Sequence, residues 1–320
     1  MLDKRGERLI IPLLGAPGIK LTNTTLKENL INPEIQFKTL DMILSEFQPD
    51  GIFTFMDLTV EVEALGLKIN FPENENPSVL DHPVKDREVL QDIKRRWKGI
   101  SGRMITFIRV AEKMAQNFKV IKGGYVIGPF TLTGELMGVN DLGINVIDDP
   151  DFVKELLEFS VNVIKEYAKA FFDAGVDVVA VLEPTAVILS PAYFREFSLP
   201  YFKYLVSELK RPLIYHICGN TSHLIEDMGK SDAYGLSLDS LVDLKWVAEK
   251  IPSHMYIIGN LDPVKVFLQG KKEDIEKKTI ELLNKMRDVK NFILSSGCDI
   301  PVGTPLENIK VFMETAKKYR

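Results

Sequence analysis

The alternation of short apolar runs with longer helical stretches is the feature that most restricts what this chain can fold into. Seven runs rich in β-branched and apolar residues are expected as strands, at 51–56, 124–128, 176–183, 212–217, 234–238, 255–260 and 291–296. Residues at helical spacing predict helices at 33–47, 86–117, 151–174, 191–209, 221–230, 241–250, 272–287 and 306–318. Strands and helices in this order are typical of a parallel sheet.

The loops between these elements favour a closed barrel over a doubly wound nucleotide fold. The stretch GAPG at 15–18 matches neither G-x-G-x-x-G nor a Walker pattern. We therefore expect a single (β/α)8 TIM barrel domain over residues 1–320 with an N-terminal extension, a size and element order that fit this fold. The eighth strand is expected near 104–110, or in distorted form. Residues 70–103, rich in Asn, Pro and charge, predict an excursion over one face.

Charge and cysteine content exclude several classes of protein. The net charge is −5 and no basic stripe is visible, which argues against nucleic acid as a partner. No apolar run approaches the ~20 residues of a membrane span, so no membrane partner is expected. The opening residues lack the pattern of a signal peptide. Two cysteines in 320 residues do not make a disulfide framework, which indicates a cytoplasmic protein with reduced thiols.

Both cysteines follow predicted strands, and one of them has a histidine close by. In YHICGN, His216 and Cys218 are two residues apart at a strand end, so their side chains point the same way, towards the active-site end of a barrel. Cys298 follows another strand, in SSGCDIP. One imidazole and two thiolates suit Zn²⁺, and three ligands with an open position are typical of catalytic zinc. The alternative is a pair of ordinary buried side chains, because free cysteine is often buried.

Several longer motifs carry a family resemblance. The stretches HICGNT, GNLDP (259–263), SSGCDIPVGTPLENIKVF (296–312), DLTVEVEALG (57–66) and GPFTLTGELMG (128–138) together resemble the uroporphyrinogen decarboxylase superfamily. Within it they resemble the corrinoid methyltransferase branch, typified by methylcobamide:coenzyme M methyltransferases. The resemblance spans nearly the whole chain. It implies a (β/α)8 barrel, in agreement with the strand pattern.

The resemblance also implies a cofactor, a partner and a reaction. His216, Cys218 and Cys298 match the zinc ligands of that branch, in which zinc presents a thiolate to a methylcobamide on a separate corrinoid protein. The implied activity moves a methyl group between the corrinoid and a small molecule. That molecule is a thiol such as coenzyme M, or tetrahydrofolate in a bacterial setting. A substrate:corrinoid protein methyltransferase is a further alternative.

The true decarboxylases of the superfamily suggest a different function, decarboxylation. They carry an N-terminal Arg-rich motif that grips substrate carboxylates, whereas this sequence has no Arg between Arg8 and Arg87. Asp57 matches the position of the decarboxylases' central Asp. It is a catalytic candidate for decarboxylation and for methyl transfer alike, because the methyltransferases share the segment that contains it. A decarboxylase needs no zinc, so it would leave the two cysteines without a role.

Other candidates lie at the ends of predicted strands. Glu183 is expected to point into the active-site end, as a fourth, displaceable zinc ligand or as a hydrogen-bonding group of the rim. Asn220 follows the ligand pair and either contacts a polar group of the substrate or forms a turn. Asp239 and Asn260 end neighbouring strands and are expected to line the pocket or to brace its rim. Gly128 permits either tight packing or close approach of the flat corrin.

Overall fold

The structure, a computed structural model, describes residues 8–320 and centres on a curled sheet of seven parallel strands. Residues 1–7 of the expected N-terminal extension lie outside the described residues. All seven predicted strands are confirmed, in the order β1-β4-β5-β6-β7-β8-β9. They are β1 (Gly51–Phe53), β4 (Ile121–Ile127), β5 (Val178–Leu182), β6 (Leu213–Ile217), β7 (Gly235–Leu238), β8 (Tyr256–Leu261) and β9 (Phe292–Ser296).

A short extended segment lies between the two outermost strands of this sheet. Ile10 forms a parallel bridge with Leu294 of β9. On the other side, the N–H of Asp50, next to β1, donates to the carbonyl of Ile10 at 3.0 Å. The described residues contain no regular eighth strand at this position. The expectation of one near 104–110 is wrong, because those residues belong to helix α6 (Arg103–Asn117).

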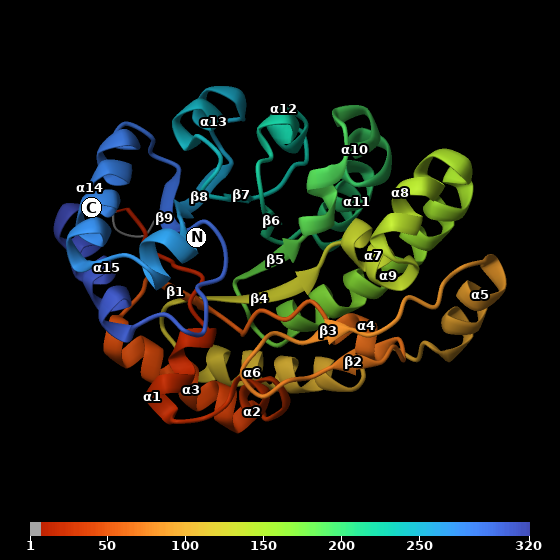
Figure 1. The fold of residues 1–320 in the computed structure, drawn as a ribbon, viewed down its shortest axis with the longest axis horizontal. Coiled ribbons are helices and arrows are strands. Elements are labelled where there is room, and N and C mark those ends of the chain that lie inside the picture. Colours follow the sequence, from red (N-terminus) through yellow and green to blue (C-terminus); the bar gives the residue numbers. More distant parts are fainter. Residues whose placement is uncertain (1–7) are drawn as a thin grey trace.

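Helices surround the curled sheet on its outside (Figure 1). The helices are α1 (Ile19–Thr22), α2 (Leu26–Ile31), α3 (Pro33–Phe47), α4 (Val60–Ala64), α5 (Arg87–Arg96), α6, α7 (Pro129–Met137), α8 (Val139–Asp148), α9 (Pro150–Asp173), α10 (Pro191–Phe197), α11 (Leu199–Leu209), α12 (Ile225–Met228), α13 (Leu244–Lys250), α14 (Lys272–Lys285) and α15 (Leu306–Tyr319). None of the described helices has both the length and the apolar character needed to cross a membrane.

Two predicted helices are each divided in the structure. The helix expected at 86–117 ends at Arg96, and a second one begins at Arg103. Between them the backbone takes φ of +88° at Gly99 and +54° at Gly102, which no α-helix tolerates. The helix expected at 191–209 breaks at Ser198.

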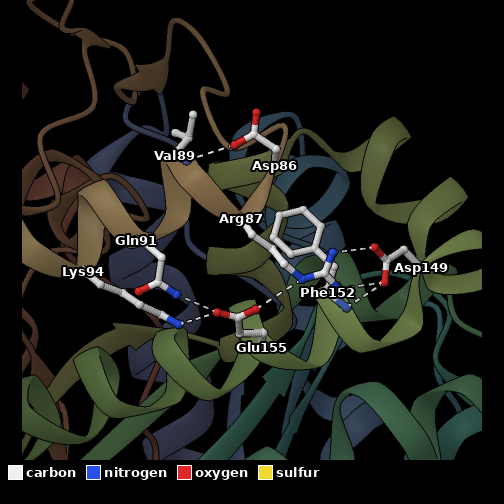
Figure 2. Close-up of polar contacts among 8 residues, drawn as sticks. All are labelled: Asp86, Arg87, Val89, Gln91, Lys94, Asp149, Phe152 and Glu155. Atoms are coloured by element: carbon white, nitrogen blue, oxygen red, sulfur yellow. Dashed lines mark hydrogen bonds and ion pairs between the residues drawn. The ribbon is translucent and has the colours of Figure 1, made fainter.

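The excursion at 70–103 contains a small hairpin of β2 (Ile69–Asn70) and β3 (Ser78–Val79), followed by α5. Figure 2 shows how α5 is attached to the following helices. Arg87 forms a two-pronged ion pair with Asp149, with N–O distances of 2.8 and 3.0 Å. Lys94 and Gln91 both reach Glu155 of α9, at 2.9 and 2.8 Å. These contacts hold the excursion against one side of the molecule.

The interior of the curled sheet is apolar over most of its depth. Inward-facing side chains such as Phe53, Tyr125, Ala180 and Ile258 pack together there. Parallel strands end at a common edge, so the residues that follow β5, β6 and β9 meet at one end of the sheet, here called the mouth. Polar side chains at the mouth therefore lie at one end of an apolar interior.

Candidate metal centre

His216, Cys218 and Cys298 come together at the mouth. The donor atoms of the three side chains lie within 4.8 Å of one another. Nε2 of His216 lies 3.0 Å from Sγ of Cys218 and 3.7 Å from Sγ of Cys298, and the two sulfurs are 3.1 Å apart. The structure thus juxtaposes the three residues that the sequence singled out, although they come from two strands that are not neighbours in the sheet.

The ring of His216 is oriented by a neighbour on the next strand. Its Nδ1 lies 2.9 Å from Oγ of Ser237, and the two residues are paired in the β6–β7 register. With Nδ1 engaged, Nε2 is the nitrogen that faces the sulfurs. An outer hydrogen bond of this kind typically fixes a metal-binding histidine. Sequence reasoning did not select Ser237, although it lies two residues before Asp239 on the same face of its strand.

The loop that carries Cys218 is braced by two of the predicted pocket residues. Gly219 has φ of +84°, which favours glycine, and its N–H donates to Oδ2 of Asp239 at 3.0 Å. Asn260 in turn donates from Nδ2 to the carbonyl of Asp239 at 2.8 Å. Asp239 and Asn260 therefore support the position of Cys218 from beside it.

The sequence allowed two roles for Asn220, a contact with the substrate or a turn. In the structure its side chain forms the hydrogen bonds of a turn. Its exposed side chain accepts hydrogen bonds from the N–H of Ser222 at 3.2 Å and from its Oγ at 2.7 Å. These bonds open the short 3₁₀ turn at Ser222–Leu224. The amide of Asn220 is thus engaged in its own loop.

The carboxylate of Glu183 is bound by the start of α7 rather than by the candidate metal ligands. It accepts hydrogen bonds from the N–H groups of Phe130 at 3.1 Å and of Thr131 at 2.5 Å, and it is not part of the His–Cys cluster. Burial raises its pKa to about 7, against the opposing effect of these bonds. A side chain at Gly128 would collide with this carboxyl group, so tight packing accounts for the glycine.

Asp57 lies in a buried ion pair that the sequence did not predict. Its side chain is fully buried and contacts Arg103, which is 7% exposed. Arg103 also donates to Glu63 at 2.5 Å and to Thr59 Oγ1 at 2.8 Å. Burial opposes the charge on Arg103, but Asp57 and Glu63 together outweigh it and raise the pKa of the guanidinium. The carboxylate of Asp57 is therefore already neutralised by the protein itself.

The buried carboxyl group of Glu61 lies close to this pair and should make the free energy of unfolding depend on pH. Burial raises its pKa to about 8 from an ordinary value of 4.5, and its Oε1 accepts from the N–H of Ile127 at 2.8 Å. Between these two values the unfolded chain has lost the proton and the folded chain keeps it, so stability falls as pH rises through this window.

From pH 5 to pH 8, Glu61→Gln should lose less free energy of unfolding than the natural protein, by roughly 3 kcal/mol. Urea unfolding at both pH values measures this, and parallel pH profiles would contradict it.

The two sulfurs of the cluster lie within hydrogen-bond distance of each other. The hydrogen bond from Cys218 lowers the pKa of the Cys298 thiol, while the same bond raises the pKa of Cys218, with burial acting in the same upward direction. One thiolate is thus favoured even before a metal binds. Two soft sulfurs and one imidazole nitrogen within reach of a single ion form a donor set that fits Zn²⁺.

A cavity of about 470 Å³ opens directly beside the cluster. Its lining includes the three candidate ligands, apolar side chains such as Leu26 and Met56, and residues 74–76 of the excursion. Its volume is in the range of small-molecule sites. Sequence reasoning missed the contribution of 74–76, because nothing local to that loop signals that it folds back over the mouth.

Comparisons with known proteins show what this chain is similar to. The sequence pattern of the uroporphyrinogen decarboxylase (URO-D) family matches residues 17–319. A methylcobamide:CoM methyltransferase, MtbA, of Methanosarcina acetivorans is 33% identical over 273 residues, covering 82% of this chain and 78% of the relative. A uroporphyrinogen decarboxylase of Prochlorococcus marinus is 29% identical over 305 residues, with 92% and 87% covered. The solved structure of a methyltransferase from Methanosarcina mazei superimposes with a TM-score of 0.88 at 26% identity, covering 98% of this chain and 94% of that one.

Proposed function

Since the chain belongs to the uroporphyrinogen decarboxylase (URO-D) family, we propose that it is a corrinoid-dependent methyltransferase of that family. In this proposal it takes a methyl group from a methylcobamide on a separate corrinoid protein and passes it to a small thiol. The observation that carries the proposal is the cluster of His216, Cys218 and Cys298 beside a cavity at the mouth. The similarity to methylcobamide:CoM methyltransferases supports it.

His216, Cys218 and Cys298 would hold a zinc ion at the mouth. When bound, zinc lowers the pKa of a thiol and keeps its sulfur as a nucleophile. Ser237 keeps the histidine ring in the required orientation, and Asp239 holds the loop after Cys218. The cavity limits the orientations of the reacting thiol, which favours a displacement that requires a linear approach.

The proposed transfer balances without any added oxidant or reductant. The thiol gives up its proton to solvent, a sulfur–carbon bond forms, and the cobalt–carbon bond of the methylcobamide breaks. The electron pair of the broken bond stays on cobalt, which becomes Co(I). The methyl group is therefore transferred as a formal cation, and the corrinoid is the leaving group.

We also propose that the whole chain acts as one barrel domain, in which residues 9–11 take the place of an eighth strand. The bridge from Ile10 to Leu294 and the bond from Asp50 to Ile10 support this closure. The likeness to the solved methyltransferase, which covers 98% of this chain, also supports it. Closure matters for function because it brings the ends of distant strands to one mouth.

A decarboxylase-type lyase is the alternative, because decarboxylases are also among the relatives. Two observations weigh against it. Asp57 is held by Arg103, so its carboxylate is not free to bind a cationic or N–H-rich substrate. The described residues between Arg8 and Arg87 contain no Arg that would pair with the substrate's carboxylates.

Metal content and methylcobalamin demethylation test the proposed function together. We expect about one zinc per chain after reconstitution under reducing conditions, and thiol-dependent loss of the methylcobalamin spectrum. His216→Ala should lose the zinc. His254→Ala is the matched control, because His254 is exposed in the turn before β8, away from the mouth. Tetrahydrofolate in place of the thiol tests the other acceptor.

Two results would contradict the proposed function. One is a protein that binds no zinc under any reducing condition. The other is a protein that decarboxylates uroporphyrinogen while leaving methylcobalamin intact. Either would favour the lyase.

A further inference from the structure

The cavity beside the metal cluster lacks a positively charged side chain. Of the described residues that line it, none is Lys or Arg. Two carboxyl groups do line it, those of Glu75 and Asp299, together with the amides of Asn74 and Asn76. The remaining wall is largely apolar, with Leu26, Met56, Leu58 and Leu182 among its side chains. An anion placed here would face the carboxylate of Glu75 and apolar surface.

Three cations on the segments that flank the cavity are engaged with other groups. The ammonium of Lys27 pairs with Glu73 at 3.3 Å. The ammonium of Lys20 donates to the carbonyls of Gly303 and Thr304 at 2.9 and 2.8 Å. The guanidinium of Arg103 is held by Asp57 and Glu63. An anionic ligand would have to break an existing contact to gain any of these three cations as a partner.

The start of α2 is likewise closed to an anion. The first N–H groups of a helix are the usual backbone site for negative charge. Here the N–H of Leu26 donates to Oδ1 of Asn74 at 3.3 Å, and that of Lys27 donates to the carbonyl of Glu73 at 3.0 Å. The N–H of Glu28 donates to Thr25 Oγ1 at 3.1 Å. These bonds satisfy the helix start, and two of them attach Glu73 and Asn74 to it.

From this charge pattern we infer that the methyl acceptor is a thiol without a negative charge, either neutral or carrying an ammonium group that Glu75 attracts. This inference rests on the proposed function and narrows its substrate class. Glu75 is exposed and has no ion-pair partner among the described residues, so its carboxylate is available to a ligand. A sulfonate or carboxylate on the acceptor would be repelled by the same group.

Three thiols with the same two-carbon chain provide the test. They are 2-mercaptoethanol, which is neutral, cysteamine, which is cationic, and 2-mercaptoethanesulfonate, which is anionic. Methylcobalamin demethylation is followed with each at one pH, and the rates are divided by thiolate concentration to remove differences in thiol acidity. We expect kcat/KM for the anionic thiol to be lower than for either of the others by at least about tenfold.

Variants at residue 75 link this preference to one side chain. Glu75→Gln should reduce the ratio of cysteamine to 2-mercaptoethanol use about fivefold, which is the scale of a partly solvated charge pair. Glu75→Arg should raise the relative use of 2-mercaptoethanesulfonate. Glu249→Gln is the matched control, since it makes the same charge change on the exposed end of α13, outside the cavity lining.

The possible outcomes separate the two proposals. If none of the thiols demethylates methylcobalamin, the proposed function itself fails. If the anionic thiol is the best acceptor, the proposed function stands and the present inference is overturned. If Glu75→Gln and Glu249→Gln behave alike, the assigned role of Glu75 is wrong. A preference for the neutral or cationic thiol that is lost in Glu75→Gln supports the inference in full.

Discussion

Cys298→Ala is expected to lose its bound zinc and about three orders of magnitude of methyl-transfer rate. Loss of a metal that contributes several kcal/mol to the transition state has an effect of this size. Cys218→Ala should behave in the same way, because the two sulfurs are 3.1 Å apart and belong to one donor set. Elemental analysis and the initial rate of methylcobalamin demethylation measure the two effects.

Both cysteine variants should remain folded. Cys218 and Cys298 are only partly buried and lie beyond the ends of their strands, so truncation leaves no closed cavity in the core. Circular dichroism and the thermal midpoint without added metal should therefore stay close to those of the natural protein. Full activity in both variants would rule out the thiol-activation mechanism.

Arg103→Leu is expected to destabilise the fold by about 3–5 kcal/mol, the cost of leaving one charge of a buried pair uncompensated. The side chain of Asp57 is fully buried and would lose its cationic partner. The double variant Asp57→Leu, Arg103→Leu should recover a large part of the loss, because the fully buried carboxylate is then gone and Glu63, the other partner of Arg103, is partly exposed to solvent. Urea unfolding of the two single variants and the double variant forms the cycle that isolates the pair.

A small effect of Arg103→Leu would contradict this account of the pair. Arg103 also stacks on Phe71 at 4.7 Å, so part of the loss comes from packing and would persist in the double variant. Arg103→Lys separates the two contributions. It keeps a positive charge but removes the planar group that reaches Asp57, Glu63 and Thr59 together.

The strands and the clustering of the three candidate metal ligands were predictable because they depend on local pattern. The two-residue spacing of His216 and Cys218 at a strand end is sufficient to place them on one side. Helix α3 was predicted with the bounds that the structure shows, since Asn32 caps it and Pro33 begins it. Helix α7 was missed, because nearly all of its residues are buried and it therefore has no amphipathic period.

The contacts that the sequence did not predict all depend on tertiary structure. Glu183 ends a strand as expected, but the start of α7 lies close enough to take its carboxylate. The pairing of Asp57 with Arg103 joins residues 46 positions apart. Ser237 reaches His216 only because of the strand register. No local spacing encodes these partners.

The separation of the two cysteines in the strand order has a consequence for the assembly of the site. Cys218 follows β6 and Cys298 follows β9, with β7 and β8 between them. In a flat sheet, strands three places apart would be separated by about 14 Å, whereas the sulfurs are 3.1 Å apart. The affinity for the metal therefore depends on the curvature of the sheet, because in a more open sheet the two sulfurs would be too far apart to bind one ion. By mass action, each tenfold rise in free zinc above its dissociation constant should add about 1.4 kcal/mol to the stability of the curled state.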